Sequence, residues 1–274
     1  MSKIATWACL LLHASWACGA GQPDERLDGL LQQTRQDREV LHGGRTAARF
    51  VTYRDADPAS ATYGVELCVL EAGSARLRVK DIRQNQSPRQ LFPSVFRDKA
   101  LGAMTGGFFG KGKGGELVPM GWVKSEGREF SPRHPWTSGG FVAWGSQGAA
   151  IVPVSKARSL SAYPQVLQSK PLLIEQGRNG IRTAGEDRFD RSAVALDDRG
   201  RLYFIVLHEP AGRAGSLAEF SHVLLRYRSA DGQALRQALA MDGGPGAHLY
   251  VPALDRHCGS GVPNYVPNAL YLEP

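Results

Sequence analysis

Short apolar segments separated by glycines are the feature that most constrains what this chain can fold into. Residues 101–153 are a succession of such segments with glycine clusters between them. The whole chain has 32 glycines and 16 prolines among 274 residues, which favours short strands joined by tight turns over a helical bundle. Apolar residues make up 42% and charged residues 22%, a composition typical of a folded domain. We therefore expect a β-rich globular protein.

The first 17 residues have the pattern of an export signal. Lys3 supplies a positive charge, residues 4–12 form an apolar run, and Ser15 and Ala17 are small residues before a cleavage point. The run is about half as long as the roughly 20 residues that a membrane span requires. The pattern predicts a signal peptide over 1–17 and a periplasmic or extracellular protein; a buried N-terminal helix is the alternative. Cys18 follows the cleavage point, so a lipid anchor at Cys18 is the one membrane attachment that we consider.

Residues 18–44 are predicted to form an N-terminal helical segment. Asp24 can cap a helix that Gly43-Gly44 would stop, and four leucines recur at near-helical spacing between them: Leu27, Leu30, Leu31 and Leu41. Residues 45–274 contain no internal repeat and no low-complexity linker, so we expect them to form one domain.

Two hairpins and one further helix are predicted in the rest of the chain. Alternating residues 63–70 and 76–80 flank a turn at 72–74, and residues 192–196 and 202–207 flank Asp198-Arg199-Gly200. Ser216 and Glu219 form a capping box before an apolar helical pattern that should fade near Ser229. Residues 84–98 indicate a loop with a short helix, and three more strands are expected at 238–241, 248–251 and 269–272.

Charge and cysteine content exclude several classes of function. Once the leader is removed, Cys68 and Cys258 remain, and this pair either forms a disulfide or consists of two buried small side chains. No cysteine or histidine spacing resembles a zinc site, so we expect neither a metal nor a cofactor. The net charge of +7 favours anionic partners, and without any nucleic-acid-binding motif we expect no nucleic acid among them.

Glycines and polar residues at predicted strand ends are candidates for a binding site. Asp242-Gly243-Gly244 directly follows an apolar strand, where glycine amides can point at an anion, although such a triplet is more often an ordinary turn. Thr105-Gly106-Gly107-Phe108-Phe109 is a second example. Arg191 opens the second hairpin and could hold a phosphate with its planar guanidinium, although a lone arginine is more often a surface residue. Gln168 and Ser169 precede a further apolar run.

Taken in order, seven short motifs between about residues 101 and 272 resemble the phosphodiester glycosidase family. They are residues 105–109, Pro119-Met120-Gly121, Ser138-Gly139-Gly140-Phe141, Gln168-Ser169 with residues 171–174, Arg191-Ser192-Ala193, Asp242-Gly243-Gly244, and Val266-Pro267-Asn268-Ala269-Leu270. The resemblance implies an α+β fold with a twisted mixed β-sheet and flanking helices, and an active site at the rim where the motifs meet. It also implies hydrolysis at the anomeric carbon of a sugar that carries a phosphodiester.

The resemblance assigns roles to individual residues. Arg191 would neutralise the phosphate, Asp242 would be a catalytic carboxylate, and His208 is a candidate proton-transfer group, with a buried histidine bonded to the backbone as the alternative. The amides of four glycines would line an anion pocket: Gly106, Gly107, Gly243 and Gly244. The other residues expected to contact substrate are Thr105, Phe109, Gln168, Ser169 and Ser192.

Two positions depart from the family pattern, and they define the alternative function. The family commonly has asparagine where this chain has Thr105, and it has serine or threonine where this chain has Pro245-Gly246-Ala247. The sequence therefore predicts an exported hydrolase of a sugar-1-phosphodiester, with a phosphorylated glycan as substrate. A non-catalytic module that binds an anionic envelope glycan is the alternative, and a purely structural envelope protein is a third hypothesis.

Overall fold

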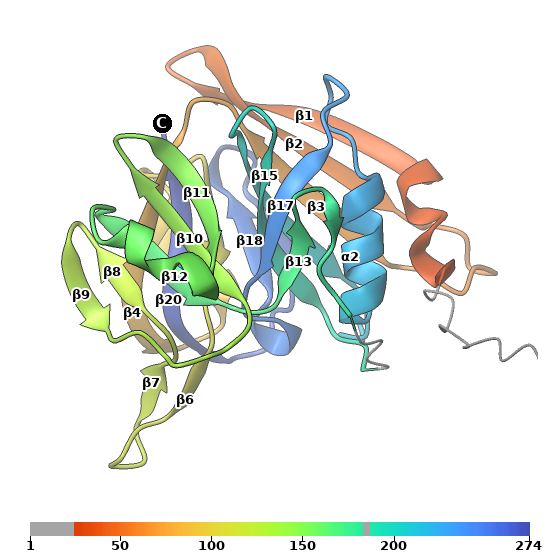
Figure 1. The fold of residues 1–274 in the computed structure, drawn as a ribbon. Coiled ribbons are helices and arrows are strands. Elements are labelled where there is room, and N and C mark those ends of the chain that lie inside the picture. The colour runs from red at the N-terminus through yellow and green to blue at the C-terminus, as the bar shows by residue number, and fades with distance from the viewer. Residues whose placement is uncertain (1–24, 183–186) are drawn as a thin grey trace, which may run out of the picture.

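The computed structural model describes residues 25–182 and 187–274, so the predicted signal peptide and Cys18 lie outside the described residues. The described chain is mostly β-strand, arranged in three large sheets and one two-stranded ribbon (Figure 1). The largest sheet has eight strands, in the order β1 (Thr34–His42), β2 (Arg45–Arg54), β3 (Glu66–Ala72), β16 (Leu202–His208), β15 (Arg191–Asp197), β17 (Leu235–Ala240), β13 (Leu172–Glu175) and β14 (Arg178–Asn179).

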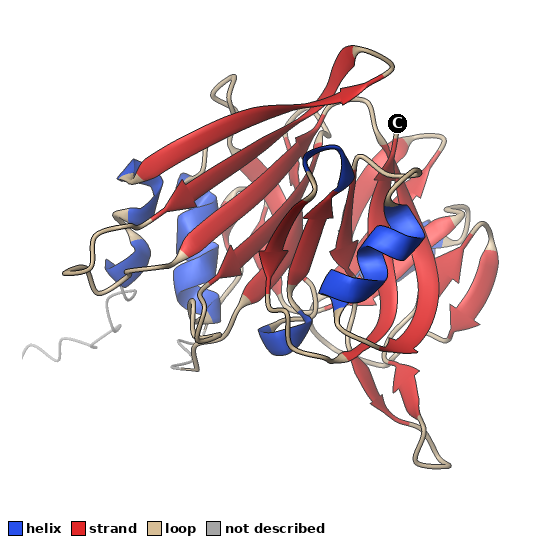
Figure 2. Ribbon diagram, turned by 180° about the vertical axis from the view of Figure 1, so that it is seen from behind, coloured by secondary structure: helices blue, strands red, loops and turns tan. Residues whose placement is uncertain are grey.

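Two five-stranded sheets complete the β-structure. One has the order β11 (Gly148–Pro153), β10 (Gly140–Gly145), β12 (Gln165–Ser169), β8 (Val123–Ser125) and β9 (Arg128–Ser131). The other has the order β19 (Arg256–Gly259), β18 (His248–Val251), β5 (Gly102–Thr105), β20 (Tyr265–Glu273) and β4 (Arg76–Asn85). The ribbon pairs β6 (Phe109–Lys111) with β7 (Leu117–Pro119) and projects from the body of the molecule (Figures 1 and 2).

The eight-stranded sheet lies between two apolar layers. On one face it packs against the helix α2 (Leu217–Arg226) and the short 3₁₀ helices Glu25–Leu27 and Leu30–Gln32. Its other face contributes to an apolar cluster that also contains side chains of both five-stranded sheets. The second α-helix, α1 (Pro88–Phe96), covers β5 and β18. No helix within the described residues is long and apolar enough to cross a membrane.

The prediction of a mixed sheet is wrong, because every pairing between the described strands is antiparallel. Parallel neighbours need a crossover of a dozen or more residues, usually a helix. This chain has two α-helices among its described residues, and tight turns join many of its consecutive strands. The architecture is therefore mostly β, with several antiparallel sheets.

The predicted N-terminal helical segment over 18–44 is also corrected. Within its described part, Glu25–Leu27 and Leu30–Gln32 form the two 3₁₀ helices, and the chain then continues as the edge strand β1. The expected stop signal Gly43-Gly44 is the turn between β1 and β2, with φ of +57° and +76°, as a two-residue hairpin requires. Leu41 is 53% exposed, so the four leucines at near-helical spacing do not form one buried face of a helix.

The local predictions in the second half of the chain are confirmed. Strands β15 and β16 form the expected antiparallel hairpin, and α2 begins after the capping box of Ser216 and Glu219.

The hairpin expected at 63–80 is wrong: β3 and β4 both exist, but β3 pairs with β2 and β16 while β4 pairs with β20. The turn between them therefore joins two different sheets.

A disulfide connects the eight-stranded sheet to a five-stranded sheet. Cys68 on β3 and Cys258 on β19 are bonded, both are buried, and 190 residues separate them along the chain. The sequence left open a disulfide or two buried small side chains, and the structure contains the disulfide. It links β19 covalently to β3, an interior strand of the eight-stranded sheet.

Candidate active site

The candidate site is built where β15 begins and where the chain leaves β17. The Met241 amide donates to the Ser192 carbonyl at 2.9 Å, and the Ser192 hydroxyl donates to the Asp242 carbonyl at 2.7 Å. The Gly244 amide donates to the Asp190 carbonyl at 2.8 Å. The two motifs that were expected to meet, Arg191-Ser192 and Asp242-Gly243-Gly244, are therefore adjacent backbone segments.

Arg191 lines a cavity of about 900 Å³, which we call the arginine cavity. Ser192 and Gly243 also line it, together with Lys170, Arg182 and Glu175. The Arg191 guanidinium donates to the carbonyls of Gly215 and Asp187 at 2.9 and 2.6 Å and lies over the Phe189 ring. Burial lowers the pKa of Arg191, and the nearby Asp187 and Glu219 raise it. The arginine is thus held in place by backbone oxygens and faces a cavity with two further cationic side chains.

Asp242 is buried beside this cavity and does not line it. Its side chain is oriented toward Gly246, since a Cβ atom at Gly246 would lie 2.2 Å from Asp242 Oδ2. Among the described residues, Oδ2 has no hydrogen-bond partner. Burial raises the pKa of Asp242 to about 7, and the Gly243 amide opposes this shift. The carboxyl group can therefore gain or lose a proton near neutral pH.

The glycine amides do not form the predicted anion pocket. The Gly106 and Gly107 amides donate to the backbone carbonyl and the side-chain Oδ1 of Asn268, at 3.0 and 2.7 Å. The Gly244 amide is bonded to Asp190, and the Gly243 amide interacts with the Asp242 carboxyl group. All four amides have protein partners, because the strand ends pack closely enough to use them.

Several residues expected to contact substrate instead support the site. Gln168 is fully buried; its Oε1 accepts from the amides of Trp122 and His134, and its Nε2 donates to the His134 carbonyl. Ser169 is fully buried and donates to the Ala240 carbonyl at 2.5 Å. These side chains join the sheet containing β12 to the loops and strands around it.

Thr105 and Phe109 also lie away from the arginine cavity. Thr105 is fully buried, and its hydroxyl has no partner among the described residues. Phe109 packs edge-on against the Tyr265 ring, with 4.9 Å between the centroids. Both positions therefore contribute to packing around the site.

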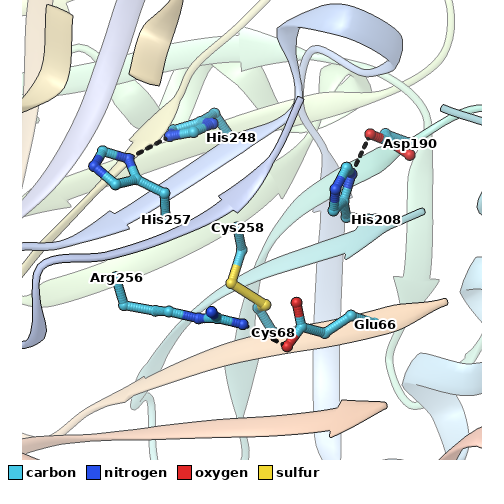
Figure 3. Close-up of a disulfide and its surroundings, with 8 residues drawn as sticks. All are labelled: Glu66, Cys68, Asp190, His208, His248, Arg256, His257 and Cys258. Atoms are coloured by element: carbon cyan, nitrogen blue, oxygen red, sulfur yellow. Dashed lines mark hydrogen bonds and ion pairs between the residues drawn. A yellow bond between two sulfur atoms is a disulfide. The ribbon is translucent and has the colours of Figure 1, made fainter. Parts of the chain in front are cut away.

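His208 lines a separate cavity of about 820 Å³, which we call the histidine cavity. Its Nδ1 lies 2.6 Å from Oδ2 of Asp190, a fully buried carboxylate (Figure 3). The alternative of a histidine bonded to the backbone is therefore wrong. Sequence reasoning missed Asp190 and Asn268, and it also missed Lys170 and Arg182 of the arginine cavity. Asn268 belonged to a recognised motif, whereas the only signal for Asp190 was its position directly before Arg191.

The sequence model of the phosphodiester glycosidase family matches residues 98–273. The chain belongs to this family.

Solved structures agree with membership of the phosphodiester glycosidase family. The fold is similar to the catalytic domain of zebrafish N-acetylglucosamine-1-phosphodiester alpha-N-acetylglucosaminidase, a structure auto-inhibited by its pro-peptide, with a TM-score of 0.60 and 13% identity over 88% of each chain. It is also similar to a hypothetical protein from Synechocystis, with a TM-score of 0.57 and 17% identity over 87% of this chain and 61% of that one. At such identities these likenesses show a shared fold. No curated protein matches this phosphodiester glycosidase family member significantly.

Proposed function

We propose that this chain is an exported hydrolase that cleaves a sugar-1-phosphodiester, with a phosphorylated glycan of the cell envelope or its surroundings as substrate. Membership of the phosphodiester glycosidase family supports a hydrolase of this type. The observation that carries the finer proposal is the position of Arg191, whose side chain lines a cavity of about 900 Å³ beside Gly243. A guanidinium in such a cavity can bind a phosphate with two parallel hydrogen bonds.

Charge neutralisation is the main requirement of the proposed reaction. When the bond between the anomeric carbon and the phosphate oxygen breaks, the leaving group is a phosphate monoester, which is already stable as an anion. Cationic groups placed around this oxygen stabilise the developing charge. Arg191, Lys170 and Arg182 line one cavity and suit this task.

Asp242 is the carboxylate that we assign to catalysis. Burial raises its pKa to about 7, so part of the Asp242 carboxyl groups is ionised at neutral pH. A carboxylate at this place can stabilise the oxocarbenium-like sugar or activate water. Because the carboxyl group faces Gly246, the assignment requires the turn Gly244–Gly246 to move aside when substrate binds.

Turnover of a model diester by Arg191 variants tests the proposal. The purified mature protein should release sugar and methyl phosphate from a sugar 1-phosphate methyl diester. Arg191→Ala should lower kcat/KM by about 10²- to 10³-fold, and Arg191→Lys should restore part of it because the charge returns without the planar geometry. Arg199→Ala, at an exposed hairpin tip, is the matched control and should change little. Full activity in Arg191→Ala would contradict the proposal.

A non-catalytic module that binds an anionic glycan is the second candidate. The burial of Asp242 outside the arginine cavity favours it, as does the absence of a hydroxyl in Pro245-Gly246-Ala247. Calorimetry with a sugar 1-phosphate, run beside the turnover assay, separates the two functions. Heat of binding with no product formed would favour the module.

Export rests on the N-terminal sequence alone. Mass spectrometry of the processed N-terminus should find a chain that begins at Cys18 after removal of residues 1–17. An unmodified Cys18 would indicate a released protein, and a lipid-bearing Cys18 would indicate a membrane anchor. Retention of Met1 in the protein isolated from its native cell would contradict export through this signal.

A further inference from the structure

Asp190 is held rigidly next to His208. Its side chain is fully buried at the start of β15, and its backbone carbonyl accepts the Gly244 amide. Oδ2 lies 2.6 Å from His208 Nδ1, and Oδ1 accepts the Glu209 amide at 3.1 Å. An ionised carboxylate can only accept hydrogen bonds, so His208 Nδ1 must carry the proton that joins the pair.

The other ring nitrogen of His208 is available to a ligand. With the proton on Nδ1, the neutral imidazole has a free acceptor at Nε2. The side chain is 20% exposed and lines the histidine cavity, and Nε2 has no hydrogen-bond partner among the described residues. A buried carboxylate that orients a histidine in this way is the arrangement found in triads, where it sets the tautomer and stabilises the imidazolium.

The histidine cavity contains charged groups from several elements. Those on its walls are Arg89 of α1, Asp187 and Arg188 before β15, and Glu209 and Arg213 after β16. His248 on β18 is close enough for its pKa to be lowered by His208 as well as by burial. Glu66 lies opposite His208 in the register of β3 and β16 and is paired with Arg256 (Figure 3). Counting Asp190, the walls carry three arginines and three carboxylates, and Arg188 is paired with Glu219, so groups of both signs are available to a ligand.

Two pairs of consecutive residues, 190–191 and 243–244, separate the two cavities, and we call them the ridge. Asp190 lines the histidine cavity and the next residue, Arg191, lines the arginine cavity. Gly243 lines the arginine cavity and the next residue, Gly244, lines the histidine cavity. A phosphodiester joins two organic groups through one phosphate, so a substrate that lies across this ridge can place one group in each cavity.

We propose that His208 takes the proton of the attacking water and that Asp190 is its positioning residue, with the substrate lying across the ridge between the two cavities. Of the two roles open to Asp242, this leaves the stabilisation of the oxocarbenium-like sugar. This inference rests on the proposed function. His208 Nε2 accepts a proton from water while the water oxygen forms a bond to the anomeric carbon. The bond from this carbon to the phosphate oxygen breaks, and its electron pair remains on that oxygen. The proton then leaves His208 for solvent, which restores the neutral imidazole.

Nitrogen NMR of the histidine rings tests the pair without any activity measurement. In protein labelled with ¹⁵N-histidine, the His208 signal is assigned by its loss in His208→Gln. At a pH where His208 is neutral, we expect the tautomer with the proton on Nδ1. In Asp190→Asn, the Glu209 amide still requires an acceptor, so the amide oxygen must stay at the Oδ1 position and the NH₂ group must face Nδ1. The His208 proton should therefore move to Nε2.

Kinetics on the same variants test the catalytic role. His208→Gln and Asp190→Asn should each lower kcat by about 10²-fold or more with a smaller change in KM, because the lost group acts in the transition state. Asp98→Asn, an exposed carboxylate away from both cavities, is the control for the change in charge. Thermal unfolding followed by circular dichroism shows whether each variant is folded.

The possible outcomes separate this inference from the proposed function. No turnover by the wild-type protein would contradict the hydrolysis itself. Turnover that survives in folded His208→Gln would overturn only the role of His208. A wild-type His208 with its proton on Nε2 would overturn the positioning role of Asp190, and this result does not depend on any assay.

Discussion

Two glycine pairs follow strands of different sheets, β5 and β17, and the structure uses them differently. The Gly106 and Gly107 amides are both bonded to Asn268, in a fully packed interior. Gly243 and Gly244 lie between two cavities and follow Asp242, whose Oδ2 has no partner within the described part of the chain. In sequence the two pairs looked equally suited to hold an anion.

The difference teaches that a glycine pair identifies a close approach of the backbone without identifying what approaches. At Gly106 an Asn268 side chain fills the space that a Cβ atom would need. At Gly243 the neighbouring cavities leave room for a ligand. Three substitutions sharpen this contrast, since they should change stability by different amounts and in different directions.

A large destabilisation, comparable in size with the pH effect at Asp242, is expected for Gly106→Ala. The new Cβ atom would lie 2.1 Å from Asn268 Oδ1, so Asn268 would have to move and release the Gly107 amide. Overpacking together with a lost buried hydrogen bond should lower the free energy of unfolding by about 3 kcal/mol. Urea denaturation measures this change. Gly29→Ala is the matched control, because no atom lies within 4 Å of its added Cβ. Equal stability of the two variants would contradict the packed role of Gly106.

Asp242→Asn should change the dependence of stability on pH. The pKa of Asp242 is about 7 in the folded protein against an ordinary value of 3.8, so the folded state binds more protons between these values. Wild-type stability should therefore fall as pH rises from about 4 to 7, by roughly 2 to 4 kcal/mol from this group. The asparagine side chain does not titrate, so the variant lacks this loss. The stability of the variant relative to wild type should therefore rise by that amount between pH 4 and pH 8.

Urea denaturation of both proteins at several pH values measures this difference. Asp98→Asn, at an exposed carboxylate, provides the control and should leave the pH dependence unchanged. If the difference in stability between wild type and Asp242→Asn were the same at pH 4 and pH 8, the buried carboxyl group would not titrate as described.

The smallest effect is expected for Thr105→Val. The Thr105 hydroxyl is buried without a partner among the described residues, so replacing it with a methyl group of similar shape should raise stability by up to about 1 kcal/mol. Thr62→Val is the contrasting variant, because the Thr62 hydroxyl donates to Asp55 and its loss should be destabilising. Thermal unfolding of both variants measures the difference. A clear loss of stability in Thr105→Val would indicate that its hydroxyl has a partner.

Local signals predicted the elements that local interactions stabilise. The hairpin of β15 and β16 and the capped helix α2 were found at the expected positions, because turn residues and caps act on neighbours a few residues away. The N-terminal strand was missed for the opposite reason. Residues 34–42 have little apolar periodicity of their own, and the pairing with β2 decides their conformation.

The sequence by itself determined the family, the β-rich class, the central hairpin and the two motifs that meet at Arg191 and Asp242. Only the tertiary structure decided that β3 and β4 enter different sheets, that Asn268 occupies the amides of the first glycine pair, and that Asp190 orients His208. The bond between Asn268 and Gly107 spans 161 residues of sequence. Contacts of this kind depend on how complete sheets pack, and no short stretch of chain contains the information that specifies them.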